Sequence, residues 1–284
     1  MDPADVGVKD GWFAAPPDAE ALRVCVPSVW DRWVPDYDGV GWYFHEFNVD
    51  SAWLQHHVVL HFEAVDYYAE VWVNGVRTGD HEGGYTPFAF CVTSHLRPDK
   101  NLLAVRVIDP HGPEGYGNFR PREIPSAKEN GYWSFAGIWG DVSIECMPRA
   151  HIEDIFILPD IRRKRINVQA TTSQSGVLRL GIDGTPFAAE GTPGALTLDF
   201  PDFELWSPDN PKCYTLTAEF DSDDGLIDSV SVRFGMREFT VKDKRFCLNN
   251  RPIFIKAALF QPDYPRSLAA PESVEMARRE IELA

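Results

Sequence analysis

Residues 70–73 alternate in character: two valines fall on one side of an extended chain, and a glutamate and a tryptophan fall on the other. A period of two indicates a half-buried β-strand. The Asn74-Gly75 pair that follows accepts the positive φ angles of a tight hairpin turn, so a second strand is expected to return antiparallel. Gly83-Gly84 indicates a second place where the backbone conformation requires glycine. An aromatic strand follows, and Pro87 must lie either on an edge strand or at the start of a strand.

The same kind of pattern fills the chain up to about residue 148. An aromatic-rich run covers 41–49, a second strand places His56, Val58, Leu60 and Phe62 on one face, and a third covers 102–107. Turn clusters rich in Gly, Pro and Asp separate these runs. Many short strands with such punctuation predict a β-sandwich or jelly roll.

A second β-unit is predicted from 149 to 239. A Gly/Asp/Ser cluster at 221–225 is the clearest of its turns. A small immunoglobulin-like sandwich fits this spacing of strands and turns. The strands are expected at 152–158, 166–170, 177–182 and 214–220.

The last segment, 240–284, has a different character. Two apolar runs flank Asn249-Asn250 and predict a hairpin. Pro271 suits the first position of a helix, and an apolar stripe at helical spacing follows it, formed by Val274, Ala277 and Ile281. No C-terminal cap follows the stripe, and nothing in the sequence is available to cover it. We therefore expect the chain to end inside the first helix of a larger domain.

Composition excludes several classes of protein. A chain of 284 residues suits two domains, or two domains and a fragment, and its net charge of −16 argues against a nucleic-acid partner. The one basic run, 162–165, lacks interleaved aromatic residues. No apolar stretch reaches the length of a membrane span, and the N-terminus lacks the features of a signal peptide. Five scattered cysteines without a CxxC pair favour reduced thiols and a cytoplasmic protein, with neither a zinc ribbon nor a disulfide framework.

Five motifs stand in order along the chain, at residues 26–30, 37–47, 137–142, 205–216 and 234–238. Together they resemble glycoside hydrolase family 2, which includes β-galactosidases, β-glucuronidases and β-mannosidases. The resemblance implies an all-β chain with a jelly-roll sugar-binding domain at 1–148, an Ig-like sandwich at 149–239, and the first strand and helix of an incomplete (β/α)₈ barrel at 240–284. Similar proteins usually carry a further strand before the position of Met1.

The resemblance also implies retaining hydrolysis by two glutamates about 5–5.5 Å apart, with no organic cofactor. In this family one glutamate follows an asparagine on a barrel strand, and this sequence contains no Asn-Glu dipeptide. We therefore assign no catalytic residue and predict that the chain alone is inactive. No metal site is predicted either, because His57 and His61 would stand about 13 Å apart along a strand.

The resemblance carries over two substrate-binding residues, Asp141 and Trp139. In β-galactosidase-like members an aspartate after the Gly-Ile-aromatic element reaches the rim of the sugar pocket, and Asp141 matches that position. A carboxylate can accept hydrogen bonds from two sugar hydroxyls at once; the competing interpretation is a simple strand-end aspartate. Trp139 is a candidate for stacking on a sugar ring or for sealing a domain interface. The loop 126–133 is a weaker candidate for the same rim.

These expectations give a leading hypothesis and two rivals. The leading hypothesis is the non-catalytic N-terminal part of a cytoplasmic glycosidase that acts on terminal β-linked sugars, with β-galactosides favoured and β-glucuronides next. Its partners would be the carbohydrate and the missing barrel of the same polypeptide, and homo-oligomer formation is left open. The rivals are a stand-alone carbohydrate-binding or interaction protein and a decayed gene product.

Overall fold

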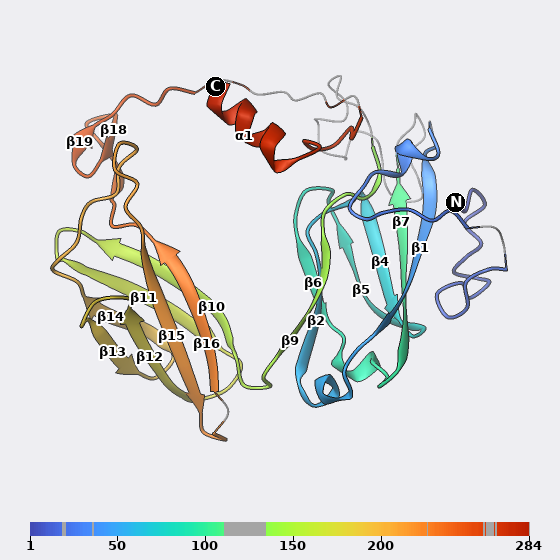
Figure 1. Ribbon diagram of the computed structural model, residues 1–284, viewed down its shortest axis with the longest axis horizontal. Helices are drawn as coiled ribbons and strands as arrows, with labels where there is room; N and C mark the ends of the chain where they lie inside the picture. Colours follow the sequence, from blue (N-terminus) through green and yellow to red (C-terminus); the bar gives the residue numbers. More distant parts are fainter. Residues whose placement is uncertain are drawn as a thin grey trace. The chain divides into compact units, whose positions relative to one another are not determined.

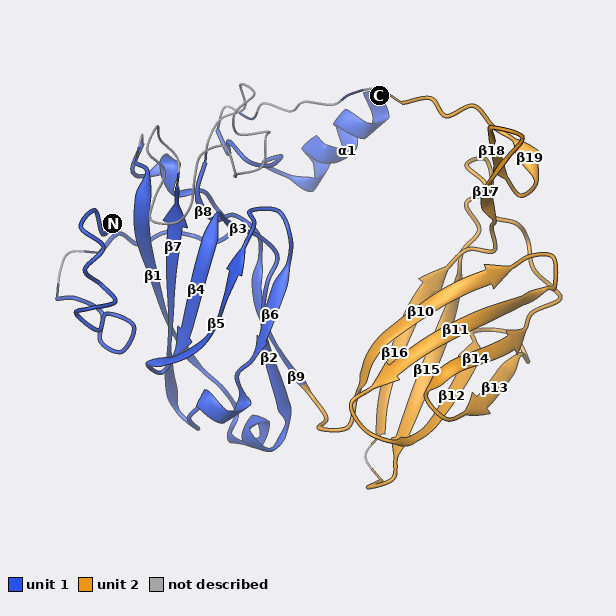
Figure 2. Ribbon diagram, turned by 180° about the vertical axis from the view of Figure 1, so that it is seen from behind, with its two compact units in different colours: residues 1–146, 258–284 blue, residues 147–257 orange. Residues whose placement is uncertain are grey.

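The computed structural model describes residues 1–18, 21–35, 37–110, 135–225, 227–257, 259, 264 and 266–283. The chain forms two compact units (Figure 2), Met1–Cys146 with Ala258–Ala284, and Met147–Ala257. Both units are built mainly of strands (Figure 1), and the first also contains helix α1, Val274–Leu283. In the described part of the chain no helix is long and apolar enough to cross a membrane. The domain boundaries expected after residues 148 and 239 stay predictions.

The first unit is a sandwich of antiparallel sheets. One sheet has four strands in the order β1-β7-β4-β5, the facing sheet has three in the order β6-β2-β9, and β3 pairs with β8. Short 3₁₀ turns join some of these strands. The bounds are β1 Gly39–Asn48, β2 His57–Phe62, β3 Val65–Asp66, β4 Tyr68–Val73, β5 Val76–Glu82, β6 Phe88–Cys91, β7 Lys100–Asp109, β8 Gly137–Ile138 and β9 Val142–Met147.

The predicted alternation places the core between these two sheets. Val58, Leu60 and Phe62 of β2 are buried against Val71 and Val73 of β4. The hairpin predicted between β4 and β5 is confirmed, since Asn74 and Gly75 have φ angles of 53° and 82°. Pro87, which has no N–H to donate to a sheet, lies directly before β6, and β6 is an edge strand. Both positions allowed by the prediction are therefore met.

Trp72 is more buried than the half-buried strand predicted for 70–73 implies, because it is only 4% exposed. The N-terminal segment, residues 1–15, covers the outer face of the four-stranded sheet. Phe13 stacks on the Trp72 ring at 5.6 Å, and Trp42 of β1 stacks on it at 5.3 Å. Ala104 of β7 lies between the strands that carry these two tryptophans, and its small side chain lets the rings meet.

Two carboxylates fix the N-terminal segment on this face. The Asp2 carboxylate accepts hydrogen bonds from the amides of Val6 and Gly7 and from Nε1 of Trp42. The Asp5 carboxylate binds the Arg106 guanidinium in a bidentate pair, with distances of 3.0 and 2.6 Å. Arg106 also binds Glu70 at 2.5 Å, so its charge, only 8% exposed at the side chain, has partners on both sides.

The second unit is the smaller sandwich that was predicted. Its sheets have the strand orders β10-β11-β14 and β13-β12-β15-β16, and Phe200, Phe220 and Leu216 are fully buried between them. All four predicted strands are present. The bounds are β10 Ile152–Asp160, β11 Arg165–Thr172, β12 Gly176–Ile182, β13 Ala188–Gly191, β14 Gly194–Asp199, β15 Tyr214–Ser222 and β16 Ile227–Phe234.

A small sheet follows in the same unit, in the order β17-β18-β19. Asn249 and Asn250 have φ angles of 52° and 65° and turn the predicted hairpin between β18 and β19. Its strands are β17 Phe239–Lys242, β18 Arg245–Leu248 and β19 Arg251–Pro252, and no strand is described at 253–257. The expected first strand of a barrel stays a prediction.

The predicted terminal helix is present, but it begins later than expected. Helix α1 spans Val274–Leu283, and Pro271 lies before it, because the Ser273 hydroxyl accepts the Met276 amide and caps the first turn. Val274 and Ile281 of the predicted apolar stripe are 71% and 77% exposed.

Replacing Arg106 tests the anchoring of the N-terminal segment. Arg106→Leu removes the guanidinium that bridges Asp5 and Glu70 and leaves Glu70 with Arg77 as its remaining cation. We expect the free energy of unfolding to fall by about 3 kcal/mol in urea denaturation followed by tryptophan fluorescence. Arg179→Leu is the matched control, because Arg179 also binds two carboxylates but is exposed. Equal shifts of the unfolding midpoint in both variants would contradict the anchoring role.

Alkaline pH offers a second test of the first unit. Burial raises the pKa of the Tyr43 hydroxyl to about 12. The unfolded chain therefore loses this proton first, near pH 10, and stability falls between pH 10 and pH 12. In the Tyr43→Phe variant, the fall in the free energy of unfolding between pH 10 and pH 12 is expected to be smaller by about 3 kcal/mol. Tyr68→Phe should remove less, because the Tyr68 hydroxyl, although its pKa is also raised to about 12, lies closer to water.

Candidate functional site

Trp139 and Asp141 lie between β8 and β9, at one end of the first sandwich. The main chain holds this segment against residues 63–66. β8 pairs with β3, the Gly140 amide donates to the Ala64 carbonyl at 3.0 Å, and the Asp141 carbonyl accepts the Glu63 amide at 2.9 Å. A Cβ atom on Gly140 would come within 2.3 Å of the Ala64 nitrogen, so only glycine permits this approach.

Trp139 is fixed on several sides. Its Nε1 donates to the Gly84 carbonyl at 2.8 Å, and its ring makes edge contacts with Tyr85 at 5.5 Å and with Phe135 at 5.4 Å. Phe135 is buried, whereas Tyr85 is 49% exposed. Within this aromatic cluster, the ring most open to a ligand is therefore that of Tyr85.

Tyr85 did not stand out as a site residue in the sequence, although the Gly83-Gly84 pair before it did. The structure explains the pair. Gly83 has a φ angle of 121°, and a Cβ on Gly84 would come within 2.3 Å of an Asp66 carboxylate oxygen. The loop can therefore lie directly on the buried Asp66, which brings Tyr85 to Trp139.

The Asp141 side chain is exposed and makes no hydrogen bond or ion pair with any other described residue. Its main chain is held by Glu63, as above. Asp141 therefore presents an unoccupied carboxylate from a fixed backbone, next to a partly exposed aromatic cluster. Carboxylate oxygens and aromatic faces are the groups that bind the hydroxyls and the C–H faces of a sugar. The loop 126–133 lies outside the described residues.

Other candidate clusters do not assemble. Within the described ranges, no group of three or more His, Cys, Asp or Glu side chains could hold a metal ion. His57 and His61, which share one strand, have different partners. His57 lies 3.7 Å from the Cys91 sulfur, and His61 lies 3.3 Å from a Glu145 carboxylate oxygen.

Two family models match the chain. Residues 29–148 match the sugar binding domain of glycosyl hydrolases family 2, and residues 150–237 match a second model of the same family. Together these matches cover well over half of the chain. The first contains the whole of the Trp139 and Asp141 segment.

Related proteins agree with these matches. The chain is 31% identical over 238 residues to a β-galactosidase of Clostridium acetobutylicum, which covers 78% of this chain and 25% of that protein. It is 27% identical over 289 residues to a putative β-glucuronidase of Formosa agariphila, which covers 94% of this chain and 34% of that protein. The chain thus spans only a quarter to a third of the length of these two relatives.

A solved structure shows the same fold. The β-glucuronidase of Lactobacillus rhamnosus superimposes with a TM-score of 0.84 at 22% sequence identity, over 100% of this chain and 50% of that one. The ordered motifs, the two sandwiches and the two family matches lead to one conclusion: this chain belongs to glycoside hydrolase family 2.

Proposed function

We propose that this chain is the non-catalytic β-sandwich part of a retaining glycosidase that hydrolyses terminal β-linked sugars. The observation that carries the proposal is the pair of consecutive matches to family 2, one for each sandwich. The chain has no Asn-Glu dipeptide, and in this family the acid/base glutamate follows an asparagine. Both catalytic glutamates would therefore come from barrel strands that follow residue 284, and the reaction would need no organic cofactor.

A β-galactoside is our first choice of substrate and a β-glucuronide the second. The β-galactosidase of C. acetobutylicum supports the first choice, and the glucuronidase-like relative of F. agariphila supports the second. We further propose a cytoplasmic location, because all five cysteines carry free thiols and two of them are exposed.

In this proposal Asp141 forms part of the rim of the sugar pocket, and Trp139 positions that rim. The exposed carboxylate would accept hydroxyl protons of the terminal sugar, while Trp139 holds Tyr85 and the Gly84 loop in place. Asp141 would thus contribute to sugar binding and leave bond cleavage to the barrel.

Reading the gene past the codon for residue 284 tests the proposal at its root. We expect an open frame of a few hundred codons with an Asn-Glu pair and a second glutamate. The encoded protein should hydrolyse p-nitrophenyl β-galactoside faster than the β-glucuronide, and the 284-residue chain alone should hydrolyse neither. A stop codon directly after residue 284, or hydrolysis by the short chain, would contradict the proposal.

Asp141→Asn in that longer protein tests the rim. Loss of a charged hydrogen-bond acceptor should raise KM for the preferred sugar about tenfold and change kcat much less. Asp99→Asn is the matched control, because Asp99 is also exposed on the first unit and makes no side-chain bond with a described residue. Unchanged KM in Asp141→Asn, or an equal change in both variants, would remove Asp141 from the site.

A further inference from the structure

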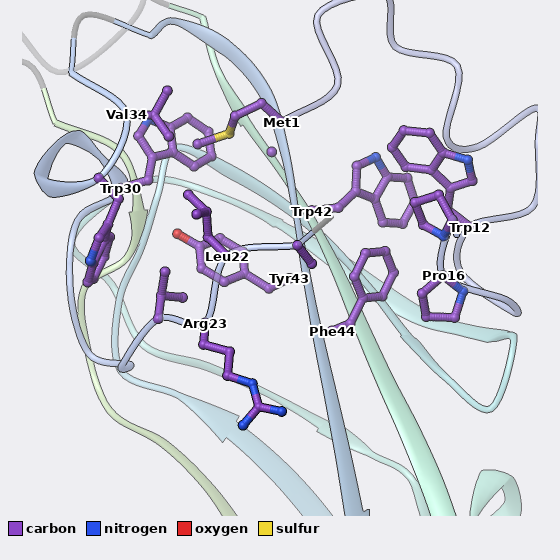
Figure 3. Close-up of a pocket in the computed structure, with 15 residues that line it drawn as sticks. Met1, Trp12, Pro16, Leu22, Arg23, Trp30, Val34, Trp42, Tyr43 and Phe44 are labelled. Atoms are coloured by element: carbon purple, nitrogen blue, oxygen red, sulfur yellow. The ribbon is translucent and has the colours of Figure 1, made fainter. Parts of the chain in front are cut away.

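A cleft in the first unit lies between residues 12–17 and 21–34 on one side and strand β1 on the other (Figure 3). Its volume is about 770 Å³, within the range of small-molecule sites. Figure 3 shows Trp12 and Pro16 beside Trp42 and Phe44, with Leu22, Trp30 and Val34 around the rest of the cleft. It is built from different segments than the Trp139 and Asp141 segment.

The aromatic walls of this cleft are fixed before any ligand arrives. Trp42 is stacked on Phe44 at 5.9 Å with nearly parallel rings, and its Nε1 is bound to the Asp2 carboxylate. Trp12 meets Trp42 edge-on at 6.0 Å. Trp33, which also lines the cleft, lies under the Arg32 guanidinium at 5.6 Å. Trp12, Trp33 and Trp42 are all partly exposed, so rigid ring surfaces remain open to solvent.

The described polar side chains of the cleft can all donate hydrogen bonds, and among them only the Tyr43 hydroxyl can also accept one. Arg23 is exposed and has no carboxylate partner among the described residues, in a chain whose net charge is −16. The indole N–H groups of Trp12 and Trp33 also make no hydrogen bond to any described residue. Among the described residues that line the cleft there is no aspartate or glutamate. A ligand that fits must offer hydrogen-bond acceptors and an anionic group together with flat C–H surfaces.

We infer that this cleft binds an oligosaccharide that carries a carboxylate. The tryptophan rings contact the C–H faces of the sugar rings, and Arg23 binds the carboxylate through a charged hydrogen bond. A purely apolar peptide would leave Arg23 and two indole N–H groups without partners, and a cationic ligand would meet no counter-charge from the described residues that line the cleft. This binding does not depend on the proposed hydrolysis, because it requires only residues of this chain.

The test is a titration of the ¹⁵N-labelled 284-residue chain with a hyaluronan tetrasaccharide, with neutral cellotetraose as the comparison. We expect the indole N–H signals of Trp12 and Trp33 to shift while that of Trp139 stays in place. The carboxylated probe should bind more tightly than the neutral one. No shift with either probe at millimolar concentration, or shifts confined to Trp139, would overturn the inference.

Variants separate the charge from the aromatic walls. Arg23→Gln should weaken binding of the carboxylated probe about tenfold and leave the neutral probe unaffected. Arg97→Gln is the matched control, since its side chain is also exposed and has no ion-pair partner among the described residues, and it should change neither affinity. Trp33→Ala should weaken both probes while the melting temperature is retained.

Two further outcomes would overturn the inference. One is that the chain binds the two probes with equal affinity and that Arg23→Gln changes neither affinity. The other is concentration-dependent self-association in analytical ultracentrifugation that Trp33→Ala abolishes, because the cleft would then be covered by a second copy of the chain. Absence of hydrolysis in the longer protein would affect the proposed function and leave these binding results unchanged.

Discussion

The buried guanidinium of Arg106 is the constraint on which the first unit depends. A buried charge is strongly destabilising without a partner. Arg106 lies on the outer face of β7, where Glu70 from β4 supplies one carboxylate and Asp5 from the N-terminal segment supplies the other. The N-terminal segment is therefore held over the sheet. Its Trp12 and Phe13 then complete an aromatic layer with Trp42 and Trp72.

This arrangement links the fold to the two ligand sites that we propose. The N-terminal segment supplies one wall of the aromatic cleft, and the sheet supplies another. At the end of the sandwich, a different set of contacts fixes the segment that carries Asp141, through Gly140 on Ala64 and Trp139 on Gly84. Asp141 at one site and Trp42 at the other are attached to backbone that the sandwich already holds, so little ordering of these two groups is needed on binding.

The sequence predicted those parts of the fold that local chemistry decides. Alternation located the strands of both sandwiches, and Asn74-Gly75 and Asn249-Asn250 located two hairpins, because turns with positive φ need such residues. The start of α1 was misplaced, since Ser273 competes with Pro271 as the signal for the first turn. The burial of Trp72 was missed. It depends on Phe13, which is remote in sequence and lies in a segment without a periodic pattern.

The candidate site was predicted only in part, for the same reason. Trp139 and Asp141 lie two positions apart in sequence, so one motif identified both. Tyr85 joins them only because Gly84 packs on Asp66, and the partners Asp5 and Arg106 are likewise 101 residues apart. Such contacts leave no local pattern in a single sequence.

The central claim is that the Asp5–Arg106 ion pair holds the N-terminal segment on the sheet. Hydrogen exchange of this segment in the Asp5→Asn variant tests it most directly, because asparagine keeps the shape of the side chain and tolerates the φ angle of 49° while it removes the charge. We predict that amides of residues 6–15 lose protection and those of β4 keep it; unchanged protection of residues 6–15 would contradict the account.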